Sequence, residues 1–127
     1  MDPVIHLDTH VLVWLYAGEQ ERLAPVMPHF WRNRVTVSPM AVLELQYLFE
    51  AGKTSKPAAV VMKELSKSVG LKVSQLNFAE VVNAALTLTW TRDPFDRLIT
   101  AQAMAEGVPL LTKDITILTH CPRARWV

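Results

Sequence analysis

The chain of 127 residues is long enough for one domain with a buried core, and a single domain over residues 1–127 is expected. Half of the residues are hydrophobic and a fifth are charged, a balance that excludes an intrinsically disordered chain. The net charge of +1 at pH 7 neither requires nor excludes a polyanionic partner, so the placement of the charges matters more than their sum.

Strand and helix signals alternate along the chain. In chain order, the predicted elements are strand 4–7, helix 9–18, helix 22–33, strand 34–37, helix 39–51, helix 57–69, strand 71–76, helix 78–88, helix 94–106, strand 108–112 and a short edge strand near 125–127. This order predicts an α/β fold in which right-handed crossovers join the strands of a parallel sheet that helices cover on both faces.

The sequence also predicts a cytoplasmic protein without a membrane contact. No apolar run approaches the roughly 18–20 residues of a membrane span. The N-terminus has an acidic second residue, Asp2, and no basic segment, so it does not resemble a secretion signal. The single cysteine, Cys121, cannot form a disulfide within the chain, which fits a reducing compartment.

Two acids follow predicted strands. Asp8 comes directly after strand 4–7, and Asp114 comes two residues after strand 108–112. Ligands of parallel sheets bind beyond the carboxyl ends of the strands, so both carboxylates should lie on the same rim. Each acid also has a structural interpretation, Asp8 as the cap of the helix that begins at Thr9 and Asp114 as part of an ordinary polar turn.

Glu44 lies on the apolar side of its predicted helix. At helical spacing it falls among Met40, Ala41, Leu48 and Ala51, and the helix supplies no lysine or arginine one turn away. A glutamate buried without a partner is unfavourable, which favours a functional role for Glu44 over a purely structural one.

The stretch "RDPFDR" at residues 92–97 begins the helix predicted over 94–106. Asp93 suits the N-cap, Pro94 the first helical position, and Asp96 the acid position of a capping box. Local physics therefore accounts for both carboxylates, which the helix dipole also favours. The rigid helix start nevertheless fixes the direction of Asp96.

Four acids from separate segments together predict a metal site. They are Asp8, Glu44, Asp96 and Asp114. Clustered carboxylates repel, and a hard cation such as Mg²⁺ or Mn²⁺ relieves that repulsion because it prefers oxygen ligands. Such ions bind phosphates, activate a water and stabilise in-line displacement. Zinc is not indicated, because the usual ligand spacings are absent from the four histidines His6, His10, His29 and His120.

These residues resemble the PIN domain family, and within it the VapC-type toxins of bacterial toxin–antitoxin pairs. The resemblance rests on "LDTHVLVWL" at 7–15, the helix with Glu44, "RDPFDRLITAQAMAEGVPLLTKD" at 92–114 and the terminal tryptophan. It implies a three-layer α/β/α sandwich with a central, mostly parallel sheet. It further implies a ribonuclease site made of Asp8, Glu44, Asp96 and Asp114, with Asp93 as an accessory acid and Thr112 as the hydroxyl before the last acid.

The resemblance implies a Mg²⁺- or Mn²⁺-dependent endoribonuclease. The metal would be held by Asp8, Asp96 and Asp114, and Glu44 would complete the site or act as a base. The implied partners are RNA, a VapB-like antitoxin that plugs the acidic groove, and a second copy in a homodimer. Exposed residues of "FWRNR" and "QYLFEAG" are candidate contacts with the protein partners.

Basic and aromatic residues near the acids have two interpretations. Arg92, Arg97 and Lys113 either hold the RNA backbone or are solvated surface charges. Trp14 and Trp90 could stack on bases, but the apolar run around Trp14 favours packing for that residue. The subgroup often has a histidine near the position of Trp90, and segment 53–77 and the C-terminal end match loosely.

Two other functions are alternatives to a ribonuclease. A phospho-accepting receiver domain would need adjacent acids after the first strand and an aspartate at the end of a middle strand, but Asp8 stands alone and "VTVSP" ends without one. A PIN-like fold that acts only as a catalytically silent interaction module remains an alternative, and metal-dependent cleavage of RNA would decide against it. The sequence does not indicate which RNA is cut.

Overall fold

The computed structural model describes residues 3–127. Met1 and Asp2, on which the expected lack of a secretion signal partly rests, lie outside the described residues. In the described part of the chain, no helix combines the length and apolar character needed to cross a membrane.

Over residues 3–127, five strands form one parallel sheet in the order β3-β2-β1-β4-β5. The strands are β1 (Val4–Leu7), β2 (Arg34–Val37), β3 (Lys72–Val73), β4 (Leu110–Leu111) and β5 (Ala124–Arg125). In the central strand, Ile5 pairs with Val35 of β2 and Leu7 pairs with Leu111 of β4. The prediction of a parallel sheet is confirmed.

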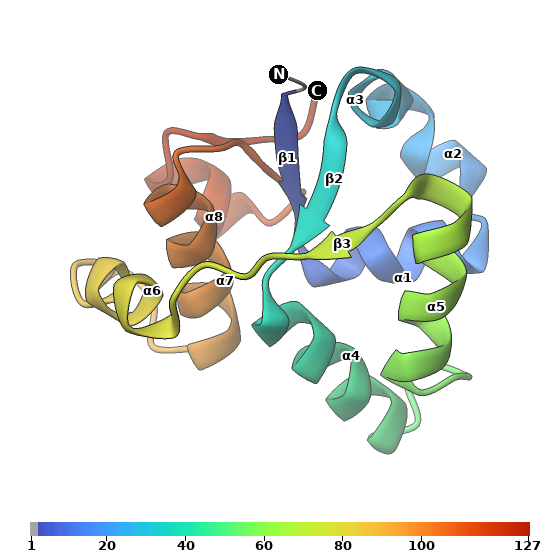
Figure 1. Ribbon diagram of the computed structural model, residues 1–127, viewed down its shortest axis with the longest axis horizontal. Coiled ribbons are helices and arrows are strands. Elements are labelled where there is room, and N and C mark those ends of the chain that lie inside the picture. Colours follow the sequence, from blue (N-terminus) through green and yellow to red (C-terminus); the bar gives the residue numbers. More distant parts are fainter. Residues whose placement is uncertain (1–2) are drawn as a thin grey trace.

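Helices flank this sheet. They are α1 (Thr9–Ala17), α2 (Gln20–Leu23), the 3₁₀ helix η1 (Ala24–Val26), α3 (Met27–Arg32), α4 (Pro39–Glu50), α5 (Ala58–Val69), α6 (Phe78–Ala85), α7 (Pro94–Glu106) and α8 (Ile115–His120). Figure 1 shows α6, α7 and α8 to the left of β1, α2, α3 and α5 to the right of β2, and α4 below the sheet. The predicted α/β architecture with helices on both sides is therefore confirmed.

The predicted helix over 22–33 is wrong as a single element. It is divided into α2, η1 and α3, and both η1 and α3 have a proline in the first turn. Pro25 and Pro28 lack a backbone N–H and cannot continue a preceding helix, although each suits the start of a new one.

Several other boundaries differ from the prediction. Strands β3 and β4 span two residues each, because Ser74 turns the chain by accepting a bond from the Leu76 N–H and Pro109 has no N–H to pair. Helix α6 ends at Ala85 instead of residue 88, and β5 begins at Ala124. Helix α8 was not predicted; it begins where Asp114 accepts a bond from the Ile117 N–H.

The core lies between the central strands and three helices. The apolar side chains Ile5, Leu7, Val35, Val37, Leu110 and Leu111 of the central strands are almost fully buried, and Leu12 of α1, Leu45 of α4 and Ile99 of α7 belong to the same cluster. Helices α1 and α4 begin just after β1 and β2, so both start at the carboxyl edge of the sheet. This edge is the one where the first acid was expected.

A buried polar network connects the start of α4 to α7. The Ser38 hydroxyl accepts from the Met40 N–H, capping α4, and donates to Gln102 Oε1 at 3.1 Å. The Gln102 amide donates to Ser74 Oγ at 3.0 Å and to Glu106 at 3.3 Å. The Glu106 carboxylate also lies 2.7 Å from His6 Nε2. The network holds α4 and α7 at fixed positions, and these helices carry the second and third acids of the site.

Candidate active site

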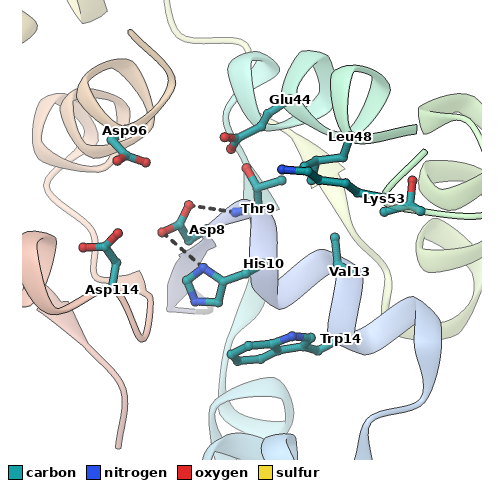
Figure 2. A pocket seen from close by; sticks show the side chains of 11 residues that line it. Asp8, Thr9, His10, Val13, Trp14, Glu44, Leu48, Lys53, Asp96 and Asp114 are labelled. Carbon is teal, nitrogen blue, oxygen red and sulfur yellow. Dashed lines mark hydrogen bonds and ion pairs between the residues drawn. The ribbon is translucent and has the colours of Figure 1, made fainter. Parts of the chain in front are cut away.

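Four carboxylates line one pocket with a volume of about 330 Å³. Figure 2 shows them directed toward a common space: Asp8 from the β1–α1 junction, Glu44 from α4, Asp96 from α7 and Asp114 from the β4–α8 junction. The structure thus brings together the four acids that were predicted from four separate segments.

Asp8 is only 4% exposed and is held by two close bonds. Its Oδ1 accepts from the Thr9 N–H at 2.8 Å, so it does cap α1, and its Oδ2 accepts from the Thr112 hydroxyl at 2.8 Å. The same hydroxyl accepts from the Asp114 N–H at 3.0 Å. Thr112 therefore bridges the first and last acids of the pocket.

Asp93 and Asp96 have separate roles in the start of α7. Asp93 Oδ1 accepts from the N–H groups of Phe95, at 2.8 Å, and Asp96, at 3.0 Å, which confirms it as the N-cap. A full capping box would also bond Asp96 to the Asp93 N–H, but that N–H donates to Thr91 Oγ1 at 3.2 Å. The Asp96 carboxylate is thus left free to face the pocket.

The acids disturb one another's protonation. Burial, followed by the carboxylates of Asp93, Asp8, Asp114 and Glu44, raises the pKa of Asp96 to about 7. Burial also raises the pKa of Glu44; the Thr9 hydroxyl opposes this shift, and the Asp8 and Asp93 carboxylates add to it. The pocket therefore concentrates more negative charge than its surroundings can stabilise.

The donor chemistry of the pocket fits a hard divalent cation. The four acids offer only oxygen donors, the ligand type that Mg²⁺ and Mn²⁺ prefer. Over the same residues, no three His, Cys, Asp or Glu side chains already form a group that could hold a metal. The fit consequently rests on the type and charge of the donors, and ligation would require the carboxylates to move closer together.

Four polar residues that line the pocket were not predicted as part of it: Thr9, His10, Lys53 and Thr54. His10 Nε2 accepts from the Lys113 N–H at 2.9 Å, so a neutral ring carries its proton on Nδ1, which lies 3.6 Å from Asp8 Oδ2. Burial lowers the pKa of His10, although the Asp8 and Asp114 carboxylates act in the opposite direction. The sequence motif "LDTH" sets Thr9 and His10 directly after the first acid, and this adjacency is the signal that could have placed them at the site.

The predicted basic residues lie in different surroundings. Lys113 is exposed and lines a depression beside Asp114. Arg92 is exposed, whereas the Arg97 guanidinium donates to three backbone carbonyls, those of Ala85 at 2.8 Å, Thr91 at 3.3 Å and Leu86 at 3.4 Å. Contacts of these residues with RNA stay a prediction.

Trp90 does not lie at the acids. Its ring stacks on His120 of α8, with centroids 5.0 Å apart and an interplanar angle of 5°.

Comparisons with known proteins identify the family and the fold. The model of the PIN domain family matches residues 5–119, a range that includes all four acids. A chain in the crystal structure of VapBC2 from Rickettsia felis, bound to a DNA fragment from their promoter, is similar with a TM-score of 0.59 and 20% sequence identity. The similarity covers 95% of this chain and 95% of that chain. A search of curated proteins gave no match.

Proposed function

This chain belongs to the PIN domain family, and from that premise we propose that it is a metal-dependent endoribonuclease and the toxin of a toxin–antitoxin pair. One observation carries the proposal: four carboxylates from four elements share one pocket, where burial and then the neighbouring carboxylates raise the pKa of Asp96 to about 7. Such mutual destabilisation is characteristic of sites whose charge is balanced by a ligand.

Asp8, Asp96 and Asp114 would hold Mg²⁺ or Mn²⁺. When bound, the cation supplies Lewis-acid polarisation of the phosphodiester and lowers the pKa of a water. Glu44, with a pKa that burial raises, accepts the proton of the water that attacks phosphorus in line. Asp8 keeps one orientation through its bonds to the Thr9 N–H and the Thr112 hydroxyl. The products carry a 5′-phosphate and a 3′-hydroxyl.

Two lysines beside the acids favour a polyanionic substrate. Lys53, from the loop after α4, lines the acidic pocket, and its N–H donates to the Leu48 carbonyl at 2.8 Å. Lys113 follows β4 next to Asp114 and lines a depression beside the pocket. Among residues 3–127, neither ammonium forms an ion pair with a carboxylate, so both are available to phosphate groups of RNA.

A protein partner is supported by the apolar surface around the pocket. A groove of about 420 Å³ adjoins it, with Val13, Tyr16, Leu45 and Val61 among its lining residues. An antitoxin of the VapB type would lay an apolar helix into this groove and direct an arginine or lysine at the acids. Exposed residues of "FWRNR" and "QYLFEAG", among them Trp31 and Tyr47, are candidate contacts with the antitoxin or with a second copy in a homodimer.

Cleavage of structured RNA by the purified chain tests the proposal. We expect cutting with Mg²⁺ or Mn²⁺ and none with EDTA. Glu44→Gln should abolish nearly all cleavage, whereas Glu50→Gln, at an exposed position of the same helix, should not. Cleavage that persists in EDTA contradicts metal dependence, and activity of Glu44→Gln within twofold, a barrier change below roughly 0.4 kcal/mol, contradicts the role of Glu44. A folded chain that cuts no RNA with either metal supports the alternative of a catalytically silent interaction module.

A further inference from the structure

A shallow depression opens beside the acidic pocket. It has a volume of about 350 Å³ and is lined by His10, Trp14, Lys113 and Asp114. His10, Trp14 and Asp114 also line the acidic pocket, so the two spaces adjoin each other. Figure 2 shows the Trp14 ring beneath the His10 ring, along α1 from Asp8. We use the term aromatic ledge for the rings of His10 and Trp14.

The aromatic ledge is held rigidly by its neighbours. The centroid of the Trp14 ring lies 4.8 Å from that of His10 and 5.7 Å from that of Trp126, which it meets edge-on. The Arg22 guanidinium lies 4.8 Å from the Trp14 centroid, and the Lys113 ammonium lies 5.8 Å from the Trp126 ring. These contacts fix the orientation of Trp14 while part of its surface still faces the two cavities.

From this juxtaposition we propose that the aromatic ledge seats one unpaired nucleobase of the RNA, next to the phosphate that enters the acidic pocket. Every nucleobase has a π-face that stacks on a fixed aromatic side chain, and proteins commonly read RNA through bases splayed out of a helix. Lys113 supplies a cation for the backbone of the same nucleotide.

This inference rests on the proposed ribonuclease function and adds to it. It says that the RNA is unpaired for at least one nucleotide beside the cut. It also says that Trp14 contributes to substrate binding beyond packing against the core.

An abasic scan on the unaltered protein tests the proposal. A single-stranded oligoribonucleotide that the protein cuts at one bond with Mn²⁺ is resynthesised with an abasic sugar at each position around that bond. We expect kcat/KM to fall about tenfold or more at one position, as loss of a stacked base requires, and to change little elsewhere. Equal cleavage of all abasic oligonucleotides overturns the base-binding role but leaves the ribonuclease function standing. Failure to cut any RNA with metal contradicts both.

Substitution of Trp14 tests whether the loss of kcat/KM with an abasic oligonucleotide arises at the aromatic ledge. Trp14→Leu should lower kcat/KM for the parent oligonucleotide by a similar factor and abolish the abasic penalty, whereas Trp14→Phe should retain the penalty. Phe78→Leu, which alters an exposed aromatic residue of α6, is the matched control.

Trp14 packs partly against the core, so melting temperatures with and without Mn²⁺ accompany the kinetics. The proposal is overturned if Trp14→Leu lowers the melting temperature but the abasic sugar still lowers kcat/KM as it does for the unaltered protein. In that case Trp14 only packs against the core. If Trp14→Leu does not fold, the abasic scan on the unaltered protein decides.

Discussion

Individual carboxylates of the pocket differ in how the chain holds them. Asp8 accepts hydrogen bonds from the Thr9 N–H and the Thr112 hydroxyl. Asp114 accepts a hydrogen bond from the Ile117 N–H. The Asp96 carboxylate has no hydrogen-bond or ion-pair partner among residues 3–127 and has the most strongly raised pKa of the site. Removal of its charge should therefore have the opposite effect on stability from removal of a cap.

Paired substitutions at the start of α7 test this difference. Asp93→Ala removes the bonds to the Phe95 and Asp96 N–H groups and should destabilise the metal-free protein by about 0.5–2 kcal/mol while leaving measurable cleavage. Asp96→Asn should leave the metal-free melting temperature unchanged or raised, because it relieves repulsion. It should also lose most of the stabilisation by Mn²⁺ and nearly all cleavage. An Asp96→Asn protein that is clearly less stable yet still cuts RNA with metal would contradict the assignment of Asp96 as a ligand.

The raised pKa of Asp96 also predicts how stability depends on pH. The pKa is about 7 in the folded protein against an ordinary 3.8, so the folded state binds more protons than the unfolded state between these values. In that window, the contribution of Asp96 makes the free energy of unfolding of the metal-free protein fall as pH rises. Saturating Mn²⁺ should remove most of this pH dependence, because the metal binds the deprotonated carboxylate and lowers its pKa in the folded protein.

Urea unfolding at several pH values between about 4 and 7 measures this effect as the difference between the unaltered protein and Asp96→Asn. Titrating groups away from the pocket contribute equally to both proteins and cancel in the difference, which then reports Asp96 together with the acids coupled to it. A difference that does not change with pH would mean that Asp96 has an ordinary pKa and is better solvated than the pocket indicates.

The length and local sequence of each helix and strand decide which parts of the fold and site could be predicted. A short apolar strand followed within a few residues by an acid is a local pattern, so the positions of Asp8 and Asp114 at the sheet edge could be expected from the sequence. Helix α8 has six residues, too few for helical periodicity to be recognised. The break at Pro25 was visible in the sequence, but the apolar residues around it favoured one continuous helix. Lys53 could not be assigned, because packing of the loop after α4 brings it to the pocket.

Helices α6 and α7 are joined by Arg97, which gives a prediction about stability. Its guanidinium donates to the carbonyls of Ala85, Leu86 and Thr91 between these helices. Arg97→Ala leaves these acceptors without a partner and should lower the free energy of unfolding by about 1–3 kcal/mol, with little change in RNA affinity. Arg97→Lys should recover only part of the loss, because an ammonium lacks the planar fork.

Arg92→Ala is the matched control, since Arg92 is exposed and its removal should barely change stability. Chemical denaturation and RNA binding are measured on all three variants. Weakened RNA binding by Arg97→Ala at unchanged stability would instead assign this arginine to the phosphate backbone.

The pocket as a whole depends on segments from both ends of the chain. Asp8 follows the first strand, Asp114 precedes the last helix, and the hydrogen bond between Thr112 and Asp8 joins residues 104 positions apart. Glu44 and Asp96 come from helices that the Ser38–Gln102 bond connects. A cation bound by acids of several elements would therefore link parts of the molecule that are distant in sequence.

Hydrogen exchange of the capped amides tests this long-range effect of the metal. The Thr9 and Ile117 amides donate to Asp8 and Asp114, which cap α1 and α8 and are themselves proposed ligands. The Asp96 amide donates to Asp93, which caps α7 beside the proposed ligand Asp96. If one cation is shared, all three should gain protection together as Mn²⁺ is added. The largest gain expected is about 2.7 kcal/mol at a hundredfold excess over Kd.

The Ala79 amide is the internal control, since Asn77 caps α6 in the same way, but neither residue lines the acidic pocket. It should exchange at an unchanged rate, because opening of an exposed helix end does not release the metal. Protection confined to one of the three helices would mean that the cation binds that element alone, and the four-element site would then be wrong.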